Sequence, residues 1–265
     1  MKLLRIRLSL DNYGRVVEWL IRIVGVDKTS GSTPDTSILI RKFLKLFKYT
    51  NLMIKAVIFD LWGTIAYNKN HIGSYIQKVI DVIGEANKEK FDLMRRDWYT
   101  SRTSELEFFT DLVKKVNLPE AMSEHLVNIW NSQLDNIALF RDSKYILELL
   151  KSRNIKLILV SNTTPISNDA IKILNLERFF DMIILSCNEG ITKPSPMIYK
   201  KVLDKFNLKP EEVLAVGDQL NTDVKGAEFY GIKAILIDRE NKLTYKNKIV
   251  ELDEIEFYLV DSKTY

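Results

Sequence analysis

The stretch Lys55-Ala-Val-Ile-Phe-Asp-Leu-Trp-Gly-Thr64 decides the fold of this 265-residue chain. Its apolar residues predict a short buried strand, and the acid Asp60 follows directly, at the start of a glycine-containing turn. A second apolar run, 213–216, is likewise followed by Asp218, with Asp223 a few residues later. Apolar strands that stop at an acid place that acid at the carboxyl edge of a parallel sheet, where open α/β folds bind their ligands. The sequence therefore predicts an enzyme with a charged site at this edge.

Composition excludes several classes of protein. The chain is 46% hydrophobic and 28% charged, which is typical of a globular protein with an ample core. Cys187 is the single cysteine, which excludes an internal disulfide framework, and His71 and His125 are too isolated for a histidine zinc site. No apolar run reaches the roughly 18 residues of a membrane span, and the N-terminus lacks the order of a signal peptide. We expect a cytoplasmic protein.

The net charge of +4 is unevenly distributed. Residues 1–52 contain ten Lys/Arg and four Asp/Glu, a balance of +6, whereas the rest of the chain has 29 basic and 31 acidic residues. The body of the chain is therefore not expected to bind nucleic acid. Two amphipathic segments of this basic leader, 16–24 and 38–48, suit contact with a membrane surface or a partner. The alternative is an appended segment without a catalytic role, because Met53 directly precedes the first strand.

Hydrophobic periodicity separates a core from an insertion. Residues 70–138 have helical spacing and no strand candidate. After Arg141, strands and helices alternate, which indicates βαβ units on a parallel sheet. The helices expected in the insertion are 72–84, 87–100, 104–116 and 121–135. The elements expected after it are helix 143–152, strand 156–160, helix 166–174, strand 182–185, helix 195–206, strand 213–216, helix 222–230 and strand 232–237.

This pattern predicts an α/β protein with a Rossmann-like parallel sheet, formed by residues 53–69 and 141–265. A helical cap, 70–140, is inserted after the first strand, beside its carboxyl end, where a lid is useful. The basic leader, 1–52, is predicted to be an N-terminal helical extension.

Four short motifs stand at the ends of the predicted strands or in the loops that follow them. They are Asp60-Leu-Trp-Gly-Thr64, Val160-Ser-Asn-Thr163, Lys193-Pro-Ser-Pro196 and Gly217-Asp-Gln-Leu-Asn-Thr-Asp223. In this order they resemble the haloacid dehalogenase-like (HAD) hydrolase superfamily, in its subgroup with a helical cap inserted after the first motif (the C1 type). The resemblance covers about residues 53–240.

The resemblance implies a nucleophile and a metal site. Asp60 would attack the substrate and form an aspartyl intermediate, which water then hydrolyses. An anionic nucleophile is repelled by a phosphate dianion, by about 4 kcal/mol for one charge pair at ~4 Å, and a divalent cation with a lysine removes that obstacle. Mg²⁺ would lie between Asp60, the backbone carbonyl of Trp62 and Asp218. Asp223 would bind the metal directly or orient the water bound to it, and would pair with Lys193.

The same resemblance implies the groups that bind the substrate. Ser161 and the backbone N–H groups around Asn162 would bind phosphoryl oxygens, and Lys193 would neutralise their charge. Thr64 would also contact the substrate. Ser161, Lys193 and Asp223 would thus act in catalysis beside Asp60.

Trp62 departs from the family pattern, because phosphatases of this family usually carry an aspartate there as general acid. Indole donates a hydrogen bond but does not release a proton at neutral pH, and general acid catalysis contributes about 10²–10⁴-fold. Dehalogenases of the family carry an aromatic residue at this position, and chloride leaves without protonation. Asp218 favours Mg²⁺ instead, because carboxylates placed together beside Asp60 without a cation repel one another.

We therefore predict a Mg²⁺-dependent phosphatase of a small phosphorylated molecule, such as an acyl or aryl phosphate, whose leaving group needs little protonation. One alternative is a metal-independent 2-haloacid dehalogenase, and another is a weakly active binding protein with the same fold. A phosphonatase would need a lysine of the cap for a Schiff base. The cap lysines are Lys78, Lys88, Lys90, Lys114 and Lys115. The cap residues considered for contact with an anionic substrate are Arg95, Arg96, Trp98, Tyr99 and Arg102.

Overall fold

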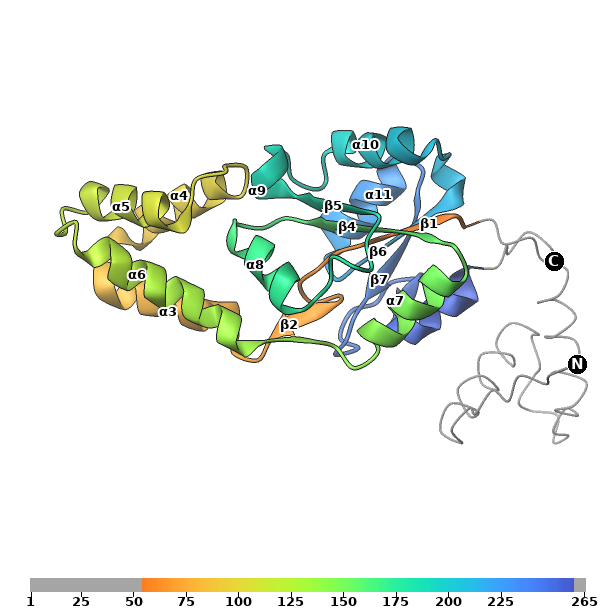
Figure 1. Ribbon diagram of the computed structural model, residues 1–265, viewed down its shortest axis with the longest axis horizontal. Helices are drawn as coiled ribbons and strands as arrows, with labels where there is room; N and C mark the ends of the chain where they lie inside the picture. The colour runs from red at the N-terminus through yellow and green to blue at the C-terminus, as the bar shows by residue number, and fades with distance from the viewer. Residues whose placement is uncertain (1–53, 260–265) are drawn as a thin grey trace, which may run out of the picture. The chain divides into compact units, whose positions relative to one another are not determined.

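The computed structural model describes residues 54–259, which form an α/β core with helices on both faces of a parallel sheet (Figure 1). The six strands lie in the order β5-β4-β1-β6-β7-β8. They are β1 (Ala56–Phe59), β4 (Lys156–Ser161), β5 (Met182–Leu185), β6 (Val213–Gly217), β7 (Lys233–Ile237) and β8 (Lys248–Ile249). The α/β fold predicted from the sequence is confirmed. The basic leader, 1–52, with its two amphipathic segments, lies outside the described residues.

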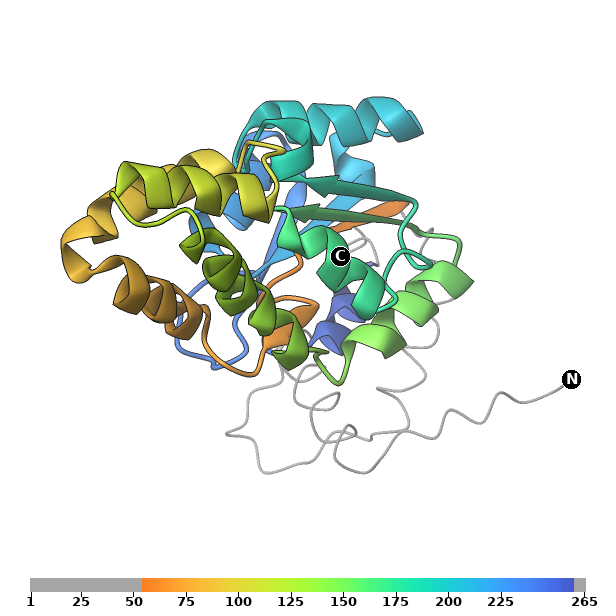
Figure 2. The ribbon, with the colours of Figure 1, turned by 60° about the vertical axis from the view of Figure 1, so that its left-hand side comes forward.

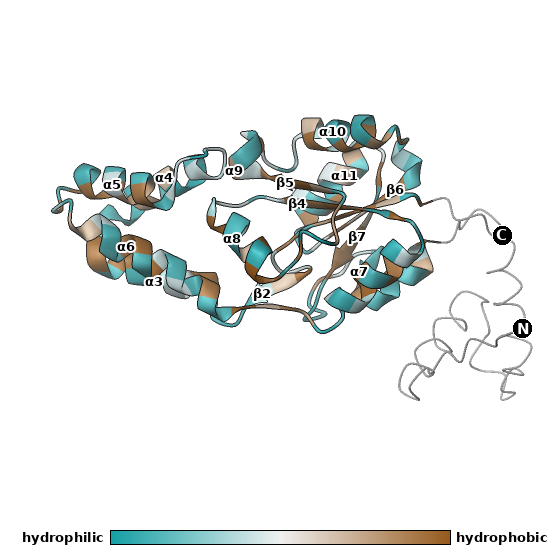
Figure 3. Ribbon diagram, viewed as in Figure 1, coloured by the Kyte–Doolittle hydropathy of each residue, from teal (hydrophilic) through white to brown (hydrophobic). Residues whose placement is uncertain are grey.

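Alternate side chains of β1 enter two separate hydrophobic clusters. Val57 and Phe59 belong to the cluster beneath α7, α8 and the 3-10 helix 252–258, whereas Ala56 and Ile58 belong to the cluster beneath α10 and α11. The helices of these two layers are α7 (Ser143–Ser152), α8 (Ile166–Ile173), α10 (Pro196–Phe206) and α11 (Lys225–Phe229). Because both faces of the sheet are covered, its strands are continuous apolar runs, and they are among the most hydrophobic segments in Figure 3.

A group of helices extends to one side of the sheet, between β2 and β3 (Figure 2). These helices are α3 (Ile72–Ile83), α4 (Lys88–Trp98), α5 (Glu105–Lys115) and α6 (Met122–Asn131). Their apolar faces form a cluster of their own, in which the Trp98 ring stacks on Phe108 with ring centroids 3.8 Å apart. Ile166 at the start of α8 belongs to this cluster, so the cap packs against the core there.

The cap is joined to the core by a two-stranded antiparallel ribbon, β2 (Ala66–Asn68) and β3 (Ile137–Leu139). The prediction that residues 70–138 contain no strand is therefore wrong at its end, because β3 begins at Ile137. Strands this short form because they pair with a partner strand some 70 residues away, and local hydrophobic periodicity does not predict that pairing.

The remaining elements follow the predicted order, with three differences. Helix 222–230 is an α-helix only from Lys225, because residues Leu220–Val224 form a π-helical turn. A short helix, α9 (Ser186–Glu189), follows β5, and β8 and the 3-10 helix Leu252–Tyr258 extend the core beyond the predicted elements. Within residues 54–259, no helix is long and apolar enough to cross a membrane.

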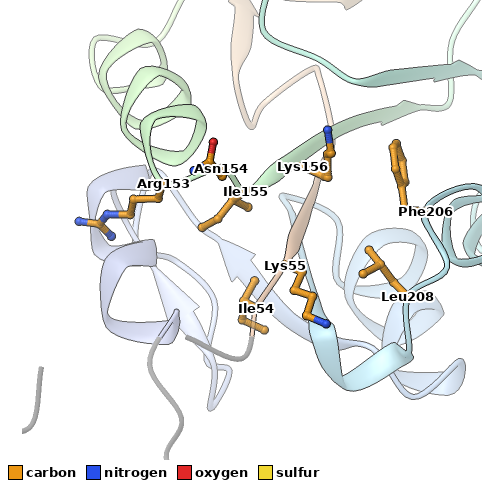
Figure 4. A pocket seen from close by; sticks show the side chains of 8 residues that line it. All are labelled: Ile54, Lys55, Arg153, Asn154, Ile155, Lys156, Phe206 and Leu208. Atoms are coloured by element: carbon orange, nitrogen blue, oxygen red, sulfur yellow. The ribbon is translucent and has the colours of Figure 1, made fainter. Parts of the chain in front are cut away.

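A cavity of about 300 Å³ lies at the end of the sheet where β1 and β4 begin (Figure 4). Its lining residues are Ile54, Lys55, Arg153, Asn154, Ile155, Lys156, Phe206 and Leu208. The basic groups there are already paired, since Lys55, Lys156 and Arg153 form ion pairs with acidic neighbours. The cavity is at the opposite edge from the predicted carboxylates, and we assign it no part in the chemistry.

Candidate active site

Three carboxylates meet at the carboxyl edge of the sheet, as the sequence predicts. Phe59 of β1 is in register with Val216 of β6, and the N–H of Asp60 donates to the Val216 carbonyl at 2.9 Å. The acids that follow the two strands are therefore neighbours. One carboxylate oxygen from each of Asp60, Asp218 and Asp223 lies within 4.8 Å of the other two.

Lys193 brings a positive charge into the same place. Its Nζ lies 2.5 Å from Asp60 Oδ1 and 2.7 Å from Asp223 Oδ1, and it donates to the Val160 carbonyl at 2.9 Å. The Lys193 side chain is only 5% exposed. Because this ammonium is bound on three sides and shielded from water, its position relative to the two carboxylates is fixed.

The loop that carries Lys193 is held by Asn162, which follows β4. The Asn162 Oδ1 accepts the Lys193 N–H at 2.7 Å, and the Asn162 Nδ2 donates to the Lys193 carbonyl at 2.9 Å. Substrate binding was predicted for Asn162 from the sequence. Its side chain also holds the backbone of Lys193, which lies 31 residues later in the chain. Ser161 is the last residue of β4 and is buried. It directly follows Val160, whose carbonyl accepts the hydrogen bond from Lys193.

The π-helical turn positions Asp223. Its N–H donates to the Gln219 carbonyl at 3.0 Å, and its Oδ2 accepts the Gln219 N–H at 3.0 Å. Glycine is required at position 217, because a Cβ there would lie 2.3 Å from Asp223 Oδ2. Gly63 is required in the same way, since its Cβ would lie 2.4 Å from Asp218 Oδ2 and its φ is +79°. The glycines beside the acids are thus explained by close approach.

The electrostatics of the site are those of a cation site. Three ionised carboxylates and one ammonium leave a formal charge of −2. Burial raises the pKa of Asp60, and Asp223 and Asp218 add to this, whereas Lys193 opposes it. Burial, followed by the charge of Asp223, raises the pKa of Asp218 to about 6. Burial favours neutral Lys193, but Asp60 and Asp223 outweigh it and hold the lysine pKa above its usual value.

A divalent cation fits these groups. It would bring the formal charge of the site to zero, and carboxylate oxygens are the ligands that hard cations prefer. Asp218 Oδ1 is buried and has no hydrogen-bond partner among the described residues, which is costly for a carboxylate unless it binds something. Asp60, Asp218 and Asp223 are therefore the residues that could hold a metal.

Trp62 lies in the turn after Asp60 and is half-buried. Its ring packs against the cluster beneath α7 and α8, and its Nε1 donates to Ser167 Oγ at 3.1 Å. Ser167 in turn shares a hydrogen bond of 2.6 Å with Thr163 of the loop after β4. No local pattern predicts this contact, because Ser167 lies 105 residues from Trp62. The other residue of the turn, Thr64, is fully buried, and its carbonyl accepts a hydrogen bond from Arg239.

Four of the five cap residues considered for substrate contact have other partners, and the fifth, Arg96, is exposed. Trp98 is buried in the cap and donates to the Thr103 carbonyl at 2.7 Å. Arg95 bonds Tyr99 and Asp92 within the cap. Arg102 reaches the core, where its Nε and Nη2 donate to the carbonyl of Asn188 after β5.

The five cap lysines are all exposed. A Schiff-base lysine is activated by desolvation, so none of them has the surroundings that a phosphonatase mechanism needs.

Comparison with known proteins decides the family. The family model described as haloacid dehalogenase-like hydrolase matches residues 54–231. The chain belongs to the haloacid dehalogenase-like hydrolases. It is therefore a hydrolase, and the resemblance of its four motifs to this superfamily is confirmed.

Its relatives include several proteins named as phosphatases of small molecules. It is 28% identical over 196 residues to glyceraldehyde 3-phosphate phosphatase of Pyrococcus abyssi, a match that covers 69% of this chain and 81% of the relative. It is 28% identical over 191 residues to phosphoglycolate phosphatase of Aquifex aeolicus, with coverages of 69% and 84%.

Among solved structures, a HAD phosphatase from Thermococcus onnurineus is 26% identical, with a TM-score of 0.60, and the match covers 78% of this chain and 98% of that one. A 2-haloacid dehalogenase from Pseudomonas syringae has a TM-score of 0.61 at 19% identity, over 78% of this chain and 98% of that one. At that identity the second likeness shows the fold alone.

Proposed function

We propose that this HAD-like hydrolase is a Mg²⁺-dependent phosphatase of a small phosphorylated molecule, with Asp60 as its nucleophile. The observation that carries the proposal is the buried Lys193 ammonium shared by Asp60 and Asp223, beside the unpartnered oxygen of Asp218. The names of the relatives support phosphate-ester hydrolysis as the reaction.

The proposed reaction has two steps at one residue. The Asp60 carboxylate attacks phosphorus, an oxygen–phosphorus bond forms, and the bond to the leaving oxygen breaks with its electron pair on that oxygen. Water then attacks the phosphorus of the aspartyl phosphate, and the bond between phosphorus and the Asp60 oxygen breaks with its electron pair on the carboxylate. Hydrogen phosphate and a proton are released to solvent. The first step needs the Asp60 carboxylate held in line with the bond that breaks, and the Lys193 contact orients it for this. In the second step water is the nucleophile and Asp60 is the leaving group.

We assign the substrate contacts to the end of β4, the loop that follows it, and the turn after β1. Ser161, the N–H groups near Asn162, and Thr64 would face the transferred phosphoryl group, and Lys193 would balance its charge. Asp60, the Trp62 carbonyl and Asp218 would bind Mg²⁺, with Asp223 binding or orienting it. When bound, Mg²⁺ would offset the negative charge that gathers on the phosphoryl oxygens.

Trp62 restricts the substrate in this proposal. Its N–H is already bonded to Ser167, and indole has no proton to release at neutral pH. The leaving oxygen must then depart with nearly its full negative charge, which favours acyl and aryl phosphates over alkyl phosphates.

The dehalogenase alternative has one observation in its favour, the aromatic side chain of Trp62. Asp218 Oδ1, buried without a hydrogen-bond partner among residues 54–259, argues against it, because a metal-independent mechanism gives that oxygen no task. The leader boundary at 52, the division into core and cap at 70–140, and a cytoplasmic location remain proposals from the sequence.

The test is a substrate panel assayed with Mg²⁺ and again with EDTA. It contains acetyl phosphate, p-nitrophenyl phosphate, glyceraldehyde 3-phosphate, phosphoglycolate and 2-chloropropionate. We expect phosphate release that needs Mg²⁺ and is fastest with the acyl and aryl phosphates. Chloride release that survives EDTA, without phosphatase activity, would establish the dehalogenase instead.

A further inference from the structure

An arginine binds the base of the cap ribbon to the core, beside the hydrogen bond from Ser143 Oγ to the Ile65 carbonyl. Arg239 follows β7, and its guanidinium contacts both chain connections that lead into the cap. On the incoming connection, Nη2 donates to the carbonyl of Thr64 at 2.7 Å, just before β2. On the outgoing connection, Nη1 lies 2.5 Å from Asp142 Oδ2, and the guanidinium stacks over the Phe140 ring at 4.0 Å.

The arginine is itself held by the core. The N–H of Asp238, its neighbour, donates to the Ile249 carbonyl of β8 at 2.9 Å. Asp142 accepts a second hydrogen bond, from the Leu252 N–H at 2.8 Å. The side chains of the ion pair are 17% and 7% exposed, so water screens it little. Arg239 therefore joins the base of the cap ribbon to the β7–β8 edge of the sheet.

The same contact reaches the catalytic turn. Thr64 lies four residues after Asp60, and Gly63 before it approaches the Asp218 carboxylate closely. A shift of the Thr64 carbonyl would move the backbone between the nucleophile and the cap. Arg239 also lies beyond residues 54–231, the range that the family model matches.

We propose that Arg239 is a positioning residue of this hydrolase, which fixes the turn after Asp60 and the base of the cap ribbon together. The inference rests on the proposed function, because its catalytic part concerns the alignment of Asp60. Replacement by lysine separates charge from geometry. Lysine retains the positive charge beside Asp142 but cannot bond two acceptors and stack on Phe140 as a guanidinium does.

The test compares the full chain with its Arg239→Lys and Arg141→Gln variants. Arg141 is the matched control, because it adjoins Asp142 in sequence, is 79% exposed and pairs with Glu251 at the surface. Hydrolysis of p-nitrophenyl phosphate at saturating Mg²⁺ gives kcat and KM, and hydrogen exchange followed by mass spectrometry gives the protection of peptides 61–68 and 137–143.

We expect Arg239→Lys to lower kcat by about 10- to 100-fold, the usual scale for a small misplacement of reacting groups, with a much smaller change in KM. The same variant should exchange faster in both ribbon peptides, while peptides from α5 and α6 are unchanged and Arg141→Gln resembles the parent. Unchanged kcat, with or without faster exchange, would overturn the positioning role, as would a lower kcat with unchanged ribbon exchange. If the parent hydrolyses no phosphate ester, the proposed function fails, and the exchange comparison still decides whether Arg239 fixes the ribbon.

Discussion

Replacing Trp62 by aspartate tests the idea that the missing general acid limits the substrate range. The substitution restores the acid that family phosphatases usually carry at this position. We expect alkyl phosphate turnover to rise by up to the 10²–10⁴-fold that general acid catalysis contributes. Aryl phosphate turnover should rise less, because an aryl oxide leaves well without a proton.

The surroundings of Trp62 indicate how much the Trp62→Asp substitution lowers the free energy of unfolding. Truncating a fully buried aromatic side chain costs about 3–5 kcal/mol, and Trp62 is half-buried, so we expect about 2 kcal/mol from lost packing. Loss of the indole donor to Ser167 adds up to about 1 kcal/mol, less if the new carboxylate accepts a hydrogen bond from Ser167. At roughly 2–4 °C for each kcal/mol in a chain of this size, the melting temperature should fall by about 4–12 °C.

The assay is a plot of log(kcat/KM) against the pKa of the leaving group, over a series of aryl and alkyl phosphates. Trp62→Phe is the control, because it retains an aromatic ring and removes the N–H without adding an acid. The parent and Trp62→Phe should share a steep slope, and Trp62→Asp should have a shallow one. A folded Trp62→Asp protein with the slope of the parent would refute the reasoning and show that another residue supplies the proton.

Four further predictions concern the same site and the leader. Asp60→Asn should abolish hydrolysis with an unchanged circular dichroism spectrum, because the amide is nearly isosteric but a very poor nucleophile; activity above about a tenth of the parent's would remove Asp60 from this role. Millimolar Mg²⁺ should raise the melting temperature of the parent but not of Asp218→Ala. Without Mg²⁺, the parent's free energy of unfolding should fall as pH rises from about 4 to about 6, because folding raises the pKa of Asp218 from 3.8 to about 6 and the native state binds the extra proton; a denaturation series without this trend would contradict the assignment. Finally, a chain that starts at Met53 should fold and remain active, because all four motifs lie beyond it; insolubility of that chain alone would show that the leader is needed.

The sheet, Asp60 and Asp218 could be predicted because each parallel strand is recognisable as an apolar run. A run followed by an acid identifies both a strand and its carboxyl end, so Asp60 and Asp218 are expected at the same edge of the sheet, and the structure shows that β1 and β6 are neighbours there. Lys193 and Asp223 were predicted by resemblance to a family, since no local pattern connects a loop lysine to a strand 133 residues earlier.

What the sequence did not reveal are contacts made by single polar groups across the fold. The Trp62–Ser167 hydrogen bond and the Arg239–Thr64 contact each join residues more than 100 positions apart, and neither leaves a periodic trace. Residues 222–224 of the π-helical turn were predicted as the start of helix 222–230, because they have ordinary helical spacing. The π-type hydrogen bond there runs from the Val224 N–H to the Gln219 carbonyl at 3.4 Å, and the Asp223 carboxylate accepts the Gln219 N–H in the same turn.

The central claim is that phosphate passes through Asp60. The most direct measurement is to mix excess protein and Mg²⁺ with an acyl or aryl phosphate labelled in its phosphoryl group, quench in acid within the first turnover, and map the label by peptide mass spectrometry. We predict a phosphoryl group on the peptide that contains Asp60, formed and lost at rates that account for phosphate release, and absent from Asp60→Asn and from samples with EDTA. Label on another residue, or phosphate release by Asp60→Asn at the parent's rate, would contradict the account.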